Sequence, residues 1–183
     1  MILASRSPQR RAILAQLGLV FEVVEPVVEE LSSGDPSAVV TENALRKARV
    51  VATGSAYAAA TVIGADTEVV LDGRVLGKPA NGAEAHAYLT ALSGARHEVH
   101  GGLAVVHSGD ERTAHAMTAV TFRVLDEAEI ARYVATGEWR ERAGGYAIQG
   151  RGAMLVASVD GDYLNVVGLP VAALVECAPE LFV

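Results

Sequence analysis

A carboxylate followed by a lysine gives the clearest chemical signal in this sequence. Residues 61–66 are apolar, small or β-branched, and they predict a buried strand that ends at Asp66. Shortly afterwards, Lys78 stands between Gly77 and Pro79 in a turn. The carboxyl ends of strands in α/β proteins open into the ligand crevice. An acid and an anion-binding cation at such a place indicate phosphate chemistry.

The composition limits the possible partners. The chain has 183 residues and a formal net charge of −7, and it is 51% apolar but only 5% aromatic. It can therefore form one substantial aliphatic core, or two small lobes that share a cleft. The negative charge argues against a nucleic-acid binder, and no apolar run reaches the roughly 18 residues of a membrane span. A single cysteine, Cys177, excludes a disulfide framework and fits a reducing cytoplasm.

The first strand and helix predict a phosphate seat. Residues 2–4 form an expected buried strand, and a helix then begins with Ser7 as N-cap and Pro8 at its first position. Free N–H groups and the helix dipole favour an anion at such an N-terminus. Ser5 supplies a hydroxyl there, and Arg10 lies on the inward face of the helix, directed toward the crevice.

A second helix is expected over residues 36–52. Lys47 shares one line of this helix with Val40, Ala44 and Val51, so it leans inward. Three basic sites, at Arg10, Lys47 and Lys78, are thus expected at junctions between strands and helices.

Two acidic sites could hold a divalent cation, namely Asp66 and the pair Glu29-Glu30. Hard cations such as magnesium prefer carboxylate oxygens and retain substrate phosphates. The alternative for Glu29-Glu30 is an ordinary charged loop, and both readings stay open. Together with the cations, these acids suit nucleotide phosphoanhydride hydrolysis, in which positioning and charge neutralisation dominate. Asp66 would either deprotonate or orient the attacking water, or hold the metal.

The remaining elements predict a mixed sheet. Two long strands, 98–107 and 113–124, are joined by a hairpin turn at Ser108-Gly109-Asp110, and they interrupt an alternation of strands and helices. Further strands are expected at 21–24, 68–71 and 154–158, and further helices at 81–92, from Asp126 to Gly137, and at 170–177. The histidines show no ligand spacing and are expected in hairpins and on the surface: His86, His97, His100, His107 and His115.

An ordered set of motifs resembles the Maf family of nucleoside triphosphate pyrophosphatases. The motifs span nearly the whole chain: Ala4-Ser5-Arg6-Ser7-Pro8-Gln9-Arg10, Lys47-Ala48-Arg49, Gly64-Ala65-Asp66-Thr67, Gly77-Lys78-Pro79, Leu92-Ser93-Gly94, Ala143-Gly144-Gly145-Tyr146-Ala147-Ile148-Gln149-Gly150 and Val167-Gly168-Leu169-Pro170. The resemblance implies one domain over 1–183, with an α/β fold in which helices flank a mixed, curved sheet. It also implies two lobes with a deep cleft, similar to the inosine triphosphate pyrophosphatases.

The resemblance implies an activity and a set of site residues. Family members split a nucleoside triphosphate into the monophosphate and pyrophosphate with a divalent cation, Mg²⁺ or Mn²⁺, and are usually cytoplasmic and often dimeric. Asp66 matches their proton acceptor, and Glu30 matches an acidic position near the metal. Their phosphate-handling positions are matched by Ser5, Arg10, Lys47 and Lys78.

Three positions bear on the base. Thr67 and Gln149 resemble the branch that acts on dTTP and UTP, and the amide of Gln149 can both donate to and accept from the imide edge of uracil or thymine. Gln9 stands where this branch often has arginine, at a specificity position. Two alternatives remain: a regulator of septum formation that acts by binding a cell-division partner, and a 7-methyl-GTP pyrophosphatase, against which Gln149 argues.

Overall fold

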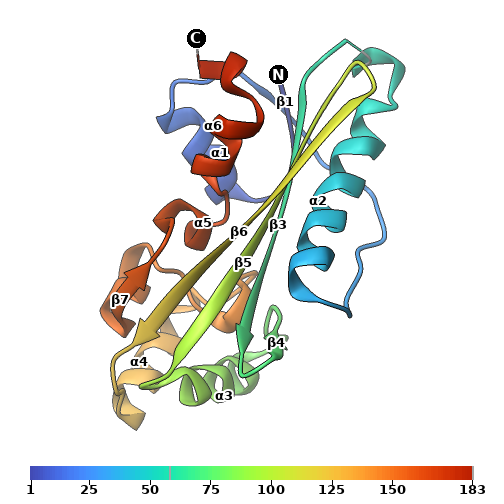
Figure 1. Ribbon diagram of the computed structural model, residues 1–183. Coiled ribbons are helices and arrows are strands. Elements are labelled where there is room, and N and C mark those ends of the chain that lie inside the picture. Colours follow the sequence, from blue (N-terminus) through green and yellow to red (C-terminus); the bar gives the residue numbers. More distant parts are fainter. Residues whose placement is uncertain (58, 183) are drawn as a thin grey trace. The chain divides into compact units, whose positions relative to one another are not determined.

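The structure, a computed structural model, describes residues 1–57 and 59–182 (Figure 1). These residues contain seven strands: β1 (Ile2–Ala4), β2 (Glu22–Val24), β3 (Val62–Leu71), β4 (Arg74–Leu76), β5 (Arg96–His107), β6 (Asp110–Phe122) and β7 (Val156–Asp160). They form one sheet in the order β2-β1-β3-β5-β6-β7, with β4 paired to β3. Parallel and antiparallel pairs both occur, so the predicted mixed sheet is confirmed.

Six α-helices occur in the described residues: α1 (Pro8–Gln16), α2 (Pro36–Ala52), α3 (Gly82–Leu92), α4 (Glu127–Thr136), α5 (Tyr163–Val167) and α6 (Val171–Cys177). Short 3₁₀ segments are η1 (Ser55–Tyr57), η2 (Ala143–Gly145), η3 (Gly150–Leu155) and η4 (Pro179–Phe182). The side chains of Ser7, Asn81 and Asp126 each accept a hydrogen bond from an amide in the first turn of their helix. These local capping signals explain why α1, α3 and α4 begin where the sequence predicts. None of the helices in the described part of the chain is long and apolar enough to cross a membrane.

The chain divides into two compact units. Unit 1 comprises Met1–Thr67, Gly101–Ala116 and Gly168–Val183, and unit 2 comprises Glu68–His100 and Met117–Val167. Strands β3, β5 and β6 each contribute residues to both units. A single domain over residues 1–183 stays a prediction from the resemblance.

In unit 1, helix α2 covers one face of the sheet, and α1 and α6 cover the other (Figure 1). β1 pairs in parallel with β2 and with β3. Small residues let α2 approach closely: a Cβ on Gly64 would lie 2.1 Å from the carbonyl oxygen of Ala44, and one on Gly102 would lie 2.0 Å from that of Val40. These glycines therefore set the depth at which α2 packs on β3 and β5.

In unit 2, α3 and α4 lie side by side (Figure 1) over a core that contains an aromatic cluster. The rings of His97, Phe122 and Tyr146 meet edge to face, with centroids 4.8–5.5 Å apart. The expectation of a surface or hairpin position is wrong for His97, which is buried, with its Nε2 2.9 Å from the Tyr146 hydroxyl. Its place inside the alternating strand β5 directs it into the core, and burial lowers its pKa to about 4.

Two predicted strand boundaries are wrong. The strands expected at 61–66 and 68–71 form one continuous strand, β3, so Asp66 lies within a strand and does not end it. The strand expected at 154–158 begins later, because residues 150–155 form η3. The Glu138 carboxylate accepts two amide hydrogen bonds from η3 at 3.3 Å, a tertiary capping contact that no local pattern reveals. Helix α5 was not predicted.

Candidate active site

The N-terminus of α1 forms the predicted polar turn. Ser5 is 3% exposed and follows directly after β1, and its Oγ accepts a hydrogen bond from the Ser7 amide at 3.1 Å. The Ser7 Oγ accepts from the Arg10 amide at 3.4 Å as the N-cap. The Gln9 side chain accepts from the Ser7 hydroxyl at 3.2 Å. The turn thus fixes a buried hydroxyl beside the first N–H groups of a helix, an arrangement that suits an anion.

Arg10 joins distant segments of unit 1. Its Nε donates to the Gly168 carbonyl at 2.7 Å, its Nη1 to the Ser5 Oγ at 3.3 Å, and its Nη2 to the Thr67 Oγ1 at 3.1 Å. Burial lowers the pKa of Arg10, and the charge of Asp66 acts in the opposite direction. A guanidinium stays protonated in proteins, so this turn carries a buried positive charge.

A second buried charge cluster lies between α2 and β3. Lys47 Nζ is 2.7 Å from Asp66 Oδ1 and 3.2 Å from Glu30 Oε1. The Asn43 Nδ2 donates to the other oxygen of Asp66, Oδ2, at 3.0 Å and to the Leu31 carbonyl at 3.0 Å, while its Oδ1 accepts from the Leu31 amide at 2.7 Å. Lys47 is thus the inward-leaning cation that the helix pattern predicts, and both oxygens of Asp66 face a donor.

The local sequence explains how these side chains meet. Asn43 and Lys47 stand four residues apart, so they share one face of α2. The absent side chain at Gly64 brings that face against β3, because any Cβ there would meet the Ala44 carbonyl. Asp66 lies two residues further along the same strand, and successive even positions share a face. The small residues Gly64 and Ala65 therefore let α2 pack closely on β3, and this close packing places the Asp66 carboxylate beside Lys47 and Asn43.

The two clusters are adjacent within unit 1. Arg10 binds Thr67, the residue next to Asp66, and its charge interacts with both Asp66 and Glu30. Seven of the nine predicted site residues lie in this unit: Ser5, Gln9, Arg10, Glu30, Lys47, Asp66 and Thr67.

Two predicted residues belong to unit 2. Lys78 pairs there with Glu141, whose Oε2 is 3.3 Å from the Lys78 Nζ, and both side chains are exposed. Gln149 is exposed and directly precedes η3. Their roles in phosphate and base binding stay predictions.

Sequence reasoning missed Asn43 and the Gly168 carbonyl. Asn43 is 1% exposed and holds both Asp66 and the backbone beside Glu30. The sequence did contain a hint: Asn43 stands four residues before Lys47, so this polar side chain lies on the face of α2 that points inward. The contribution of Gly168 is a main-chain carbonyl from far along the chain. No side-chain pattern could reveal it.

The donor set fits a divalent cation supported by substrate oxygens. Glu30 and Asp66 both contact one Lys47 Nζ, so their carboxylates are near neighbours, and the Glu30 side chain is 46% exposed. One or two carboxylates together with phosphate oxygens are the usual protein environment of magnesium. Among residues 1–57 and 59–182, no group of three or more His, Cys, Asp or Glu side chains is placed to hold a metal by itself.

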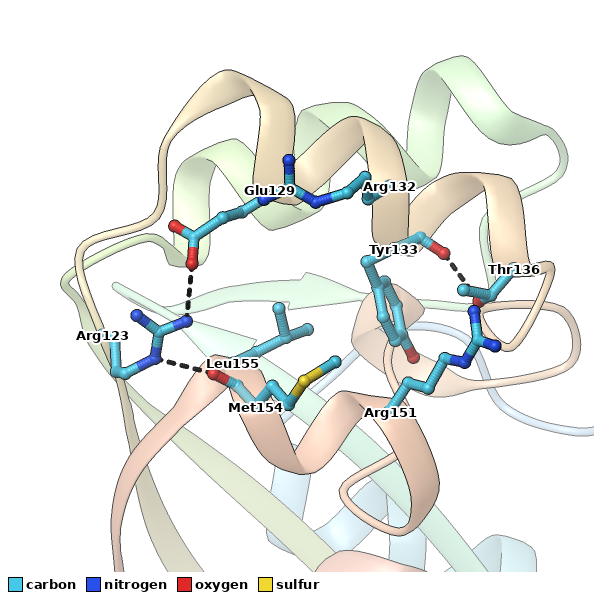
Figure 2. A pocket seen from close by; sticks show the side chains of 8 residues that line it. All are labelled: Arg123, Glu129, Arg132, Tyr133, Thr136, Arg151, Met154 and Leu155. Carbon is cyan, nitrogen blue, oxygen red and sulfur yellow. Dashed lines mark hydrogen bonds and ion pairs between the residues drawn. The ribbon is translucent and has the colours of Figure 1, made fainter.

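A pocket of about 260 Å³ occurs in unit 2, between α4 and η3 (Figure 2). None of the predicted site residues lines it. The catalytic role of Asp66 in unit 1 stays a prediction; its buried carboxylate lies close to the buried cations Lys47 and Arg10.

Comparison with known proteins places the chain in a family. The family described as Maf-like protein matches residues 1–181. A dTTP/UTP pyrophosphatase from Moorella thermoacetica is 51% identical over 180 residues, covering 96% of this chain and 92% of the relative. One from Symbiobacterium thermophilum is 49% identical over 178 residues, covering 96% and 91%. A solved structure named nucleoside-triphosphatase, dITP/XTP pyrophosphatase, from Mycobacterium abscessus has 21% identity and a TM-score of 0.45, covering 68% of this chain and 74% of that one.

The family match spans almost the full sequence, and the relatives are about half identical over the same length. The expected resemblance is thus confirmed, and this chain belongs to the Maf-like proteins.

Proposed function

We propose that the chain hydrolyses nucleoside triphosphates, dTTP and UTP foremost, to the monophosphate and pyrophosphate. The observation that carries the proposal is the buried cluster in which Asp66 faces Lys47 and Asn43 next to the Arg10 turn. Relatives at about 50% identity are named dTTP/UTP pyrophosphatase, which supports the activity and favours pyrimidines over 7-methyl-GTP. No observation favours the septum-formation alternative.

The Arg10 turn supplies the phosphate seat in this proposal. The N–H groups at the start of α1 and the Ser5 hydroxyl bind phosphate oxygens. A guanidinium has five N–H donors, and three protein acceptors occupy Arg10, so donors remain for a phosphate. Lys47 compensates the negative charge that collects on the phosphates during hydrolysis.

Hydrolysis forms a bond between a water oxygen and the α-phosphorus and breaks the bond from that phosphorus to the bridging oxygen, which leaves with pyrophosphate. The proton of the attacking water passes to the Asp66 carboxylate if Asp66 is the base. If Asp66 is instead a metal ligand, it acts with Glu30 to hold the cation, Mg²⁺ or Mn²⁺. A bound cation would supply charge neutralisation and lower the pKa of water. In both cases Asn43 holds the Asp66 carboxylate in orientation.

The other parts of the proposal rest on the family resemblance. Lys78 is assigned to phosphate, and Gln9, Thr67 and Gln149 to the choice of base. The deep cleft, the homodimer and the cytoplasmic location likewise stay predictions.

A substrate panel tests the function. The purified chain is incubated with canonical and modified nucleoside triphosphates, and pyrophosphate release is measured with magnesium, with manganese and with a chelator. We expect release from dTTP and UTP that the chelator abolishes. Release from 7-methyl-GTP alone, or from no triphosphate, would refute the proposal.

Paired variants test the catalytic carboxylate. Asp66→Asn should lose most turnover and keep the far-UV spectrum of the fold. Asp72→Asn is the matched control, because Asp72 is an exposed turn residue with φ 50°, a conformation that asparagine also adopts. Equal loss, or equal retention, of activity in the two variants would contradict the assignment of Asp66.

A further inference from the structure

The unit 2 pocket is built from one face of a helix and one short turn. Residues of α4 recur at helical spacing along its wall, and η3 forms the opposite side (Figure 2). The lining residues are Arg123, Glu129, Arg132, Tyr133, Thr136, Arg151, Met154 and Leu155.

Hydrogen bonds hold both walls in place. Arg123 Nε donates to the Met154 carbonyl at 2.7 Å, and its Nη2 is 2.8 Å from Glu129 Oε1, so one side chain links α4 to η3. The Glu138 carboxylate accepts two amides of η3. The pocket is therefore preformed, which lowers the entropy cost of binding.

The pocket carries excess positive charge. Its lining contains three arginines and one carboxylate, that of Glu129. Arg123 already forms a hydrogen bond with Glu129, which lowers the pKa of that carboxyl group. In the described part of the chain, the guanidinium groups of Arg132 and Arg151 have no hydrogen bond or ion pair, and both residues are exposed, but the charge of Arg132 acts on Glu129. A pocket lined by three arginines and one carboxylate contrasts with the net charge of −7 of the whole chain. The excess positive charge favours an anionic ligand.

The floor of the pocket is apolar and partly aromatic. Met154 is 64% exposed, and the buried Leu155 lies beside it (Figure 2). The Tyr133 hydroxyl accepts a hydrogen bond from the Ala147 amide at 2.9 Å, which fixes the ring, and a small part of this 4% exposed residue faces the space. The flexible thioether of Met154, next to the fixed ring of Tyr133, can change its rotamer to pack against a flat ligand. An anion without an apolar or planar body would leave this surface unused.

We propose that this pocket binds a small planar phosphate ester of mononucleotide size. Its phosphate is held by Arg151, since a guanidinium fork matches phosphate oxygens, while Arg132 at the Glu129 end of the pocket adds positive charge (Figure 2). Its ring packs on Met154 and on the small part of Tyr133, 4% exposed, that faces the space. The volume of about 260 Å³ lies just below the usual range for ligand pockets, which limits the ligand to one base or ring. The proposal does not depend on the pyrophosphatase function, because its residues are separate from the predicted catalytic set.

Methionine-methyl NMR offers a local readout that needs no turnover. The chain has three methionines, of which only Met154 lines this pocket. The ¹³C-methyl-labelled chain is titrated with UMP, AMP, phenyl phosphate, uridine and pyrophosphate, and Met154→Leu assigns the signal. We expect a saturable shift of the Met154 methyl with UMP or phenyl phosphate, and much weaker binding of uridine and pyrophosphate. Binding of phenyl phosphate would identify a general aryl phosphate site, and binding of nucleotides alone would identify a nucleotide site.

Arginine variants tie the shift to the pocket. Arg132→Ala with Arg151→Ala should weaken the affinity about tenfold or more, which corresponds to one charged hydrogen bond. Arg140→Ala is the matched control, because this exposed arginine stacks on Trp139 and does not line the pocket. The proposal is overturned if no ligand gives a saturable Met154 shift, if pyrophosphate or uridine alone binds as tightly as the ester, or if the double variant binds normally.

Discussion

Replacement of Lys47 by methionine tests the energetic role of the buried cluster. Methionine keeps the length and the apolar packing of the side chain but removes the ammonium that contacts Asp66 at 2.7 Å and Glu30 at 3.2 Å. Asp66 is 8% exposed, and among the described residues it would retain the amide of Asn43 as its hydrogen-bond donor. Breaking a buried ion pair costs about 3–5 kcal/mol because it leaves one charge uncompensated. We expect a loss of about 3 kcal/mol, the lower end, since Glu30 reaches solvent.

Urea unfolding followed by far-UV circular dichroism measures this loss. With an m value of about 2 kcal/mol per molar urea, the midpoint should fall by about 1.5 M. Arg46→Met is the control on the same helix, because Arg46 forms a partly exposed i,i+4 pair with Glu42 at 2.8 Å and an exposed hydrogen bond to the Glu29 carbonyl at 3.2 Å. Such pairs contribute less than about 1 kcal/mol.

Two results would refute this reasoning. One is an equal midpoint shift for Lys47→Met and Arg46→Met, which would mean that the buried pair contributes no more than a surface pair. The other is an unchanged cost of Lys47→Met in an Asp66→Asn background, where a neutral amide replaces the carboxylate. A coupling between the two positions is expected for groups in contact.

Three further predictions follow from other contacts. Asn43→Ala should lower kcat about tenfold with a smaller change in KM, because the Asp66 carboxylate loses the donor that orients it. Steady-state pyrophosphate release measures both constants, and an unchanged kcat would contradict the prediction. Gly64→Ala should destabilise the fold by about 3 kcal/mol or more in urea, whereas Gly77→Ala, with open space around the new Cβ, should cost little; similar costs would refute the packing argument. Burial holds the pKa of His97 at about 4, below its ordinary 6.5. Below pH 6.5 the unfolded chain therefore takes up a proton on His97 before the folded chain does. The free energy of unfolding that the neutral imidazole supports above pH 6.5 is lost as the pH falls toward 4, by about 3 kcal/mol at most. His97→Phe should flatten the pH dependence of the urea midpoint between pH 7.5 and 4.5, and parallel profiles would contradict the prediction.

The local patterns predicted most of the fold because they depend on near neighbours in the sequence. Capping residues such as Ser7 and Asp126 satisfy amides within one turn, and the inward line of α2 follows from helical spacing. The patterns failed where a distant group decides the outcome. The Glu138 carboxylate binds amides of η3, and β7 therefore begins later than the sequence predicts. His97 is buried because Phe122 and Tyr146 pack against it.

The site divides in the same way. The sequence by itself determined the residue types and the family: an acid, three cations and a serine at a helix start, in an order that matches Maf-like proteins. Only the tertiary structure decided that Asp66 lies within a strand, that Asn43 completes its hydrogen bonds and that a carbonyl from Gly168 anchors Arg10. The physical reason is that hydrogen bonds and ion pairs act over about 3 Å in space. Their partners are therefore chosen by packing, which the order of residues along the chain does not display.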